Sequence, residues 1–97
     1  MYVILTSKPG QFRTELVDGM HAVEAYDYLF CGRKRAHFVI AELEGEVRIR
    51  IVEEGARAVV NHVPSKFLPR FATLEQARAE LEQLAGNGAL DAALVRL

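Results

Sequence analysis

The chain has 97 residues, of which 51% are hydrophobic and 26% are charged, and its formal net charge is -1. This composition excludes a disordered chain and is typical of one soluble globular domain, which we expect to span residues 1–97. The balanced charge argues against a dedicated nucleic-acid-binding protein, because such proteins neutralise phosphates with an excess of Lys and Arg.

Glycines divide the first half of the chain into segments rich in Val, Ile, Tyr and Phe. Glycine supplies the positive φ that tight turns need, so this spacing is typical of consecutive antiparallel strands. We predict six strands in chain order, over residues 2–7, 11–17, 21–30, 36–43, 46–53 and 57–63.

The strand predicted over 46–53 has the clearest pattern, because its apolar residues alternate with charged ones. Such a period of two buries one face of a strand and leaves the other face in water. A two-residue loop at 44–45 would pair this strand with the preceding one and set Val47, Ile49 and Ile51 opposite Glu42, Ile40 and Phe38.

Aromatic residues occupy the alternate positions 26, 28 and 30 of the strand predicted over 21–30. These rings share a face with Phe38 and Ile40 only if the connecting loop has an odd number of residues. We therefore predict a loop of three or five residues within 31–35. Residues 20–30 also fit a helical pattern, but their aromatic and β-branched side chains favour a strand.

A helix is predicted after the irregular link over 65–72. Pro64 ends the preceding strand, since proline lacks the backbone N–H that a ladder needs. Thr73 and Gln76 fit a capping box, in which each side chain satisfies a free backbone donor at the start of a helix. The apolar stripe that follows at helical spacing consists of Leu74, Ala77, Leu81 and Leu84.

Gly86 is placed to end this helix, and we expect a short second helix over 89–95. The predicted fold class is α+β: a five- or six-stranded antiparallel meander, forming a twisted sheet or a partly open barrel, packed by the C-terminal helix. The leucines of the helix should pack on the sheet. The expected core consists of Val3, Leu5, Phe12, Tyr28, Phe38, Ile40, Val47, Ile49, Ile51, Val59, Phe67 and Phe71.

The most polar junction of the chain lies where the last predicted strand becomes a loop. Asn61, His62, Ser65 and Lys66 bring together an amide, an imidazole, a hydroxyl and an amine, and loops held by a rigid scaffold often carry function. These four residues are the candidate ligand site, in which His62 and Lys66 could bind an anionic group. The alternative is that they satisfy the backbone where the sheet ends.

A nucleic-acid interface is the second candidate site. It consists of basic residues at a hairpin tip and on a strand face: Arg33, Lys34, Arg35, Arg48 and Arg50. Arginines would hold phosphates while Tyr26 or Tyr28 stacked on bases. Tyrosines on the core face would point away from the strand arginines, however, and basic residues on strands also protect sheets from aggregation.

The sequence shows no catalytic, metal-binding or cofactor motif. Cys31 is the single cysteine, which excludes an intramolecular disulfide, and a small residue at a hairpin tip is its simplest explanation. His21, His37 and His62 lack the spacing of metal ligands. Asp27, between two tyrosines, is the carboxylate that we expect to be half-buried.

We therefore expect a non-enzymatic binding or accessory module that acts through protein–protein contacts, alone or as a homodimer, without a cofactor. The alternatives are a small β-domain that binds nucleic acid and a small enzyme whose site is shared between subunits. The N-terminus has no basic region of a secretory signal, and the apolar stretches are shorter than a bilayer span. A cytoplasmic protein that does not contact membranes is the expectation.

Overall fold

The computed structural model describes residues 1–55, 57, 59–86 and 90–97. In these residues the elements follow one another as β1 (Tyr2–Ser7), β2 (Phe12–Glu15), β3 (Met20–Phe30), β4 (Arg33–Leu43), β5 (Arg48–Glu53), β6 (Val60–Pro64), the 3-10 helix η1 (Ser65–Phe67), α1 (Leu74–Leu84) and β7 (Ala92–Arg96). The predicted α+β class is confirmed, and residues 20–30 form a strand rather than a helix.

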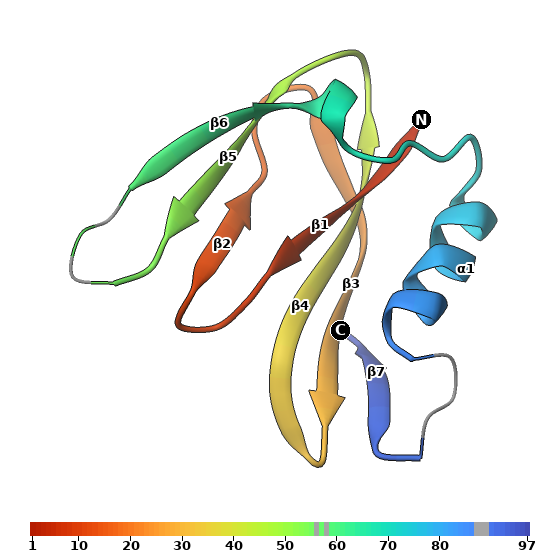
Figure 1. Ribbon diagram of the computed structural model, residues 1–97. Helices are drawn as coiled ribbons and strands as arrows, with labels where there is room; N and C mark the ends of the chain where they lie inside the picture. Colours follow the sequence, from red (N-terminus) through yellow and green to blue (C-terminus); the bar gives the residue numbers. More distant parts are fainter. Residues whose placement is uncertain (56, 58, 87–89) are drawn as a thin grey trace.

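The described strands form two antiparallel sheets, one in the order β1-β4-β3-β7 and one in the order β2-β5-β6. Figure 1 shows β1 lying between the other strands of the two sheets, with α1 beside the larger sheet. Hairpins join β3 to β4 and β5 to β6, whereas β1 pairs with β4 and β2 pairs with β5. The predicted single meander is therefore more specific than the structure shows. A residue pattern indicates that a segment is a strand, but it does not identify the distant strand with which the segment pairs.

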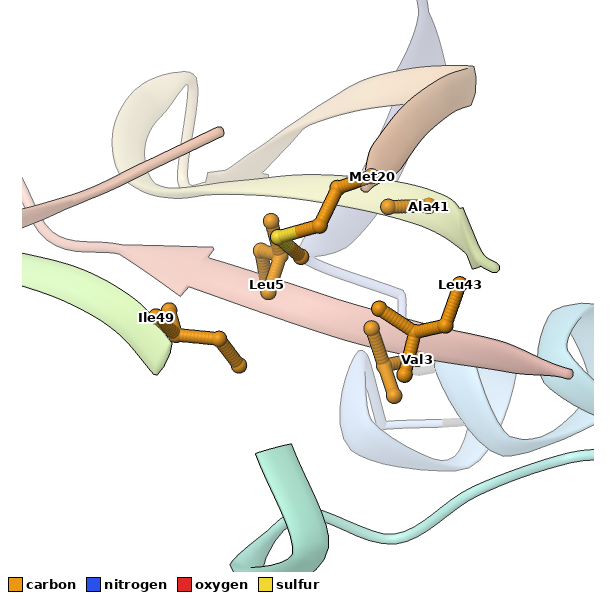
Figure 2. Packing of buried hydrophobic residues seen from close by; sticks show 6 residues of the cluster. All are labelled: Val3, Leu5, Met20, Ala41, Leu43 and Ile49. Carbon is orange, nitrogen blue, oxygen red and sulfur yellow. The ribbon is translucent and has the colours of Figure 1, made fainter. Parts of the chain in front are cut away.

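β4 and β5 are not paired, so the hairpin predicted around residues 44–45 is wrong. Ile49 of β5 packs in a cluster between the two sheets, whereas Ile40 and Phe38 of β4 pack in a second cluster with α1. The apolar residues that we predicted to face one another therefore pack in two different clusters. Figure 2 shows the cluster between the sheets, which consists of Val3, Leu5, Met20, Ala41, Leu43 and Ile49.

The β3–β4 hairpin turns through Cys31 and Gly32 alone, so the predicted loop of three or five residues is wrong. The predicted sharing of a face is nevertheless confirmed, because a β-bulge at Arg35 shifts the pairing by one residue and sets Tyr26 opposite Phe38. The rings of Tyr28 and Phe38 accordingly lie 6.3 Å apart between centroids.

α1 begins as predicted, because the Thr73 hydroxyl accepts a hydrogen bond from the backbone N–H of Gln76 at 3.1 Å. The Gln76 side chain accepts a hydrogen bond from the N–H of Ala72 at 3.1 Å, one residue before the cap. Gly86 follows the helix with a φ of 87°, the left-handed conformation common after a helix end. Within the described part of the chain, no helix has both the length and the apolar character needed to cross a bilayer.

α1 covers one face of the larger sheet. Ala77 and Leu81 are buried there with Ile40, and Leu74 is partly buried beside them. Leu84 is 54% exposed, so its predicted burial against the sheet is wrong. It lies at the last turn of the helix, at one end of the covered face.

The C-terminal segment forms β7 and not the predicted helix over 89–95, of which residue 89 lies outside the described residues. β7 pairs antiparallel with β3, from Tyr26 opposite Arg96 to Phe30 opposite Ala92. The ladder with β3 outweighs the helix propensity of the alanines and leucine in this segment.

Ten of the twelve predicted core residues are buried or partly buried, and the other two are exposed. The buried members are Val3, Leu5, Phe38, Ile40 and Ile49. The partly buried members are Phe12, Tyr28, Val47, Ile51 and Phe71. Val59 and Phe67 are 44% and 70% exposed, because one precedes the edge strand β6 and the other lies in η1 on the link to α1.

We predict that Cys31→Asn stabilises the protein. Cys31 and Gly32 have φ angles of 53° and 74°, the pair of positive values that a type I′ turn requires. Asparagine tolerates this conformation better than cysteine, so the free energy of unfolding should rise by about 0.5–1 kcal/mol. Urea denaturation under reducing conditions measures the change, with Cys31→Val as the matched control that should lower stability. An unchanged or lower midpoint for the asparagine variant would contradict the assigned turn.

Candidate functional site

The four predicted ligand residues lie on β6 and in η1, where three of them are exposed and one is buried. Asn61 and His62 are exposed on the edge strand β6, and Lys66 is exposed in η1. Ser65 is fully buried, and its hydroxyl accepts a hydrogen bond from the N–H of Val47 at 3.0 Å. The N–H of Ser65 donates to the Val47 carbonyl at 2.8 Å, so this residue fastens the link to the start of β5. Anion binding by the four residues stays a prediction.

The basic residues of the nucleic-acid alternative are exposed but divided between the two sheets, Arg33, Lys34 and Arg35 on β4 and Arg48 and Arg50 on β5. Lys34 Nζ lies 3.2 Å from a carboxylate oxygen of Asp27, and Arg50 Nε lies 3.2 Å from one of Glu15. Two of these cations are thus already paired with acidic neighbours, and nucleic-acid binding stays a prediction.

Glu24 of β3 is a buried carboxylate that the sequence patterns did not single out. Its side chain is 2% exposed and accepts hydrogen bonds from the Tyr26 hydroxyl at 2.5 Å and from Arg78 Nε of α1 at 2.9 Å. Arg78 also donates to the second carboxylate oxygen through Nη2, and Arg96 Nη2 of β7 lies 3.2 Å from that oxygen. One carboxylate therefore fastens α1 and β7 to the sheet.

The donors around Glu24 favour its ionised form. The hydrogen bond from Arg78 lowers the pKa of Glu24 to about 2, although burial acts in the opposite direction. Burial, together with the hydrogen bond to Glu24, raises the pKa of Tyr26. Both carboxylate oxygens are occupied by protein donors, which leaves little capacity for a ligand.

Asp27 is half-buried as predicted and lies opposite His37 in the β3–β4 ladder. His37 Nδ1 is 2.9 Å and Lys34 Nζ is 3.2 Å from the same carboxylate oxygen. The hydrogen bond with His37 is the main cause that lowers the pKa of Asp27. The residues that the structure describes contain no group of three or more His, Cys, Asp and Glu that could hold a metal ion.

Three adjoining cavities form one hollow along β1, which we call the β1 groove. The first, of about 150 Å³, shares Ile4, Thr6 and Leu68 with the second, of about 210 Å³. The second shares Thr6 and Leu84 with the third, of about 480 Å³. Apolar side chains from both sheets and the link complete most of the lining: Leu5, Phe12, Ile49, Ile51, Val63, Pro69, Phe71, Ala36 and Phe38.

The outer edge of β1, away from β4, is closed by a backbone bridge at each end. Tyr2 and Phe71 exchange hydrogen bonds of 2.8 and 2.9 Å, and Lys8 and Phe12 exchange hydrogen bonds of 2.9 and 3.1 Å. These bridges show that the backbone groups of the even-numbered residues point away from β4, toward the link and β2.

Between the two bridges the outer edge of β1 is open. Backbone groups alternate in direction along a strand, so Ile4 and Thr6 point to the same side as the bridged residues. The N–H and carbonyl of Ile4 and the N–H of Thr6 have no backbone partner among the described residues, whereas the Thr6 carbonyl accepts a hydrogen bond from the Thr14 hydroxyl at 2.5 Å. Both residues line the first and second cavities, so this open stretch of strand lies along the groove.

Charged residues lie at two places in the β1 groove. Lys8 and Arg35 line the third cavity, and Glu80 of α1 lines the second. None of these three residues forms an ion pair with another residue that the structure describes. Sequence reasoning missed this site because its lining comes from all the strands except β7, from the link and from α1, and only Arg35 and Tyr28 of the nucleic-acid alternative line it.

Comparison of the chain with protein-family models, curated proteins and solved structures finds no match. The candidate site therefore rests on its own geometry. The β1 groove combines an unpaired stretch of strand edge, apolar walls and charged side chains, which is the usual make-up of a binding site for an extended ligand.

We predict that Glu24→Gln lowers the free energy of unfolding by about 2 kcal/mol at pH 7, because charge-assisted hydrogen bonds to Arg78 are lost in a buried place. Glu44→Gln is the matched control, since its ion pair with His21 at 2.9 Å is exposed and should contribute less than about 1 kcal/mol. Urea denaturation measures both. Equal losses of unfolding free energy in the two variants would contradict the role of the Glu24 carboxylate in holding α1 and β7 on the sheet.

The same variant should lose its effect in acid. The folded pKa of Glu24 is about 2, below its ordinary value of 4.5, so its contribution to stability is present above about pH 5 and is lost as the pH falls from about 4.5 to about 2. The stability difference between Glu24→Gln and the unmodified protein should therefore shrink between pH 7 and pH 2.5. A constant difference would show that the carboxylate charge is not the cause.

Proposed function

We propose that this protein is a non-enzymatic binding module that captures an extended segment of a partner protein along β1. The observation that carries the proposal is the open edge at Ile4 and Thr6 inside the apolar β1 groove. A segment laid there would pair its backbone with the free groups of these residues, which is how strand-addition modules bind. The apolar walls would contact those of its side chains that point to one face.

The position of the edge favours β1 over β7, the other edge strand of the larger sheet. None of the residues of β7 lines the β1 groove. A bare edge offers backbone hydrogen bonds without apolar contact, and each such bond contributes only about 0.5–1.5 kcal/mol in water. Walls that exclude water strengthen those bonds and add the burial of apolar surface.

The other expectations from the sequence have less support. The cations of the nucleic-acid alternative lie on two sheets, and two of them are paired with carboxylates. A second copy of this chain is one partner that the groove could hold, which keeps the homodimer within the proposal. The enzyme with a shared site and the cytoplasmic location stay predictions.

The open edge predicts a contrast in amide exchange in the free protein. Val3 and Leu5 point toward β4 and donate within the ladder, whereas the amides of Ile4 and Thr6 lack a backbone acceptor among the described residues. Deuterium exchange followed by NMR should therefore be at least about tenfold faster at Ile4 and Thr6 than at Val3 and Leu5. Equal protection at all four amides would show that the edge is already paired and would remove the basis of the proposal.

Binding itself is tested with a library of seven-residue peptides labelled with fluorescein at the amino end. Peptides that raise fluorescence anisotropy should slow amide exchange at Ile4 and Thr6, and Leu84→Asp should weaken peptide binding by about tenfold or more by placing a negative charge in the apolar wall. Val59→Asp is the matched control, because Val59 is similarly exposed but lines none of the three cavities. A library without binders, or binders that leave both amides unprotected, contradicts the proposal.

A further inference from the structure

The third cavity of the β1 groove concentrates positive charge in apolar surroundings. Lys8 and Arg35 line it together with the aromatic residues Tyr28 and Phe38, and no carboxylate is among its lining residues. Both cations are exposed, so their attraction for an anion depends on the salt concentration. The guanidinium of Arg35 can hold a carboxylate with two parallel hydrogen bonds.

The backbone bridge between Lys8 and Phe12 blocks the outer edge of β1 at this same end of the groove. A segment paired with Ile4 and Thr6 cannot continue along the strand past this bridge, because Phe12 occupies the next position on the edge. The Tyr2–Phe71 bridge blocks the other end of this edge in the same way, so the two cations, and not the bridge, distinguish the Lys8 end. A chain that ends near Lys8 brings a terminal carboxylate to them.

We infer that the β1 groove binds the C-terminal residues of a partner protein, with the free terminal carboxylate held between Lys8 and Arg35. This inference rests on the proposed strand addition and adds the direction of the bound segment. β1 runs from Tyr2 toward Lys8, so a segment whose C-terminus lies near Lys8 runs parallel to β1. Roughly five residues, at about 3.3 Å each, span the distance from Ile4 to Lys8.

The charge order along the groove defines the partner segment further. Glu80 lines the second cavity with Ile4 and Thr6, on the side of the groove away from the Lys8–Phe12 bridge. A Lys or Arg a few residues before the C-terminus would lie beside this carboxylate, and the residues between would contact the apolar walls. The expected ligand is thus a short tail with a basic residue, then apolar residues, then the terminal carboxylate.

Pairs of fluorescein-labelled pentapeptides test the inference. Each pair has one sequence with a Lys at its second position and apolar residues at its last two, made once as the free acid and once as the C-terminal amide. The free acids should bind about tenfold tighter or more in fluorescence anisotropy titrations, because amidation removes the charge that Lys8 and Arg35 attract. Raising the salt concentration should reduce this advantage.

The double variant Lys8→Gln with Arg35→Gln should abolish the preference for the free acid. Arg48→Gln with Lys66→Gln removes the same charge from exposed positions that line none of the three cavities, and it should leave the preference intact. Acid and amide forms that bind equally well and protect Ile4 and Thr6 would overturn the C-terminal inference while strand addition stands. Peptides that bind in neither form, or bind without protecting those amides, would overturn both.

Discussion

Successive side chains of β1 point to opposite faces of the strand, and both hydrophobic clusters of this fold depend on that alternation. Val3 and Leu5 point into the cluster between the two sheets, whereas Tyr2 and Ile4 pack in the cluster under α1. A strand whose two faces are both covered has only its edges left to meet other groups. One edge of β1 is paired with β4 over its whole length, so its outer edge is the single side from which a segment could approach.

The groove exists because the smaller sheet diverges from β1 after their common hairpin. The backbone bridge at Lys8 and Phe12 holds the two strands together at the turn, and farther along the contact passes to side chains. The N–H of Thr14 donates to the Ser7 hydroxyl at 2.9 Å, and the Thr14 hydroxyl donates to the Thr6 carbonyl. Beyond this point apolar side chains line the space between β1 and the smaller sheet, where a regular ladder would otherwise run.

The far wall of the groove depends on an electrostatic contact elsewhere in the molecule. Glu24 joins Arg78 of α1 and Arg96 of β7 to β3, and this fixes the helix on the sheet. The same helix brings Leu84 and Glu80 to the groove. Since a buried carboxylate without its donors is costly, this contact sets the position of α1 as well as contributing to its stability. The last turn of α1 is exposed and adds little to the core, but its Leu84 lines one side of the β1 groove.

The sequence by itself determined the local structure. Period-two alternation and glycine spacing identified the six strands of the first part, and the capping residue Thr73 identified the start of the helix. Even the sharing of a face by Tyr26 and Phe38 followed from the pattern, although a bulge at Arg35 and not an odd loop produced it. These features depend on contacts between near neighbours in the chain, whose spacing is visible in the residues themselves.

Only the tertiary structure decided which strands pair, where β7 lies and how the groove forms. The partners of β1 and of Glu24 come from distant segments, and alternation alone does not distinguish one distant apolar strand from another. The open edge at Ile4 and Thr6 is an absence of pairing, which leaves no mark on residue type because backbone groups are the same in every residue. A site built from backbone edges and dispersed apolar side chains therefore becomes visible only once the sheets are in place.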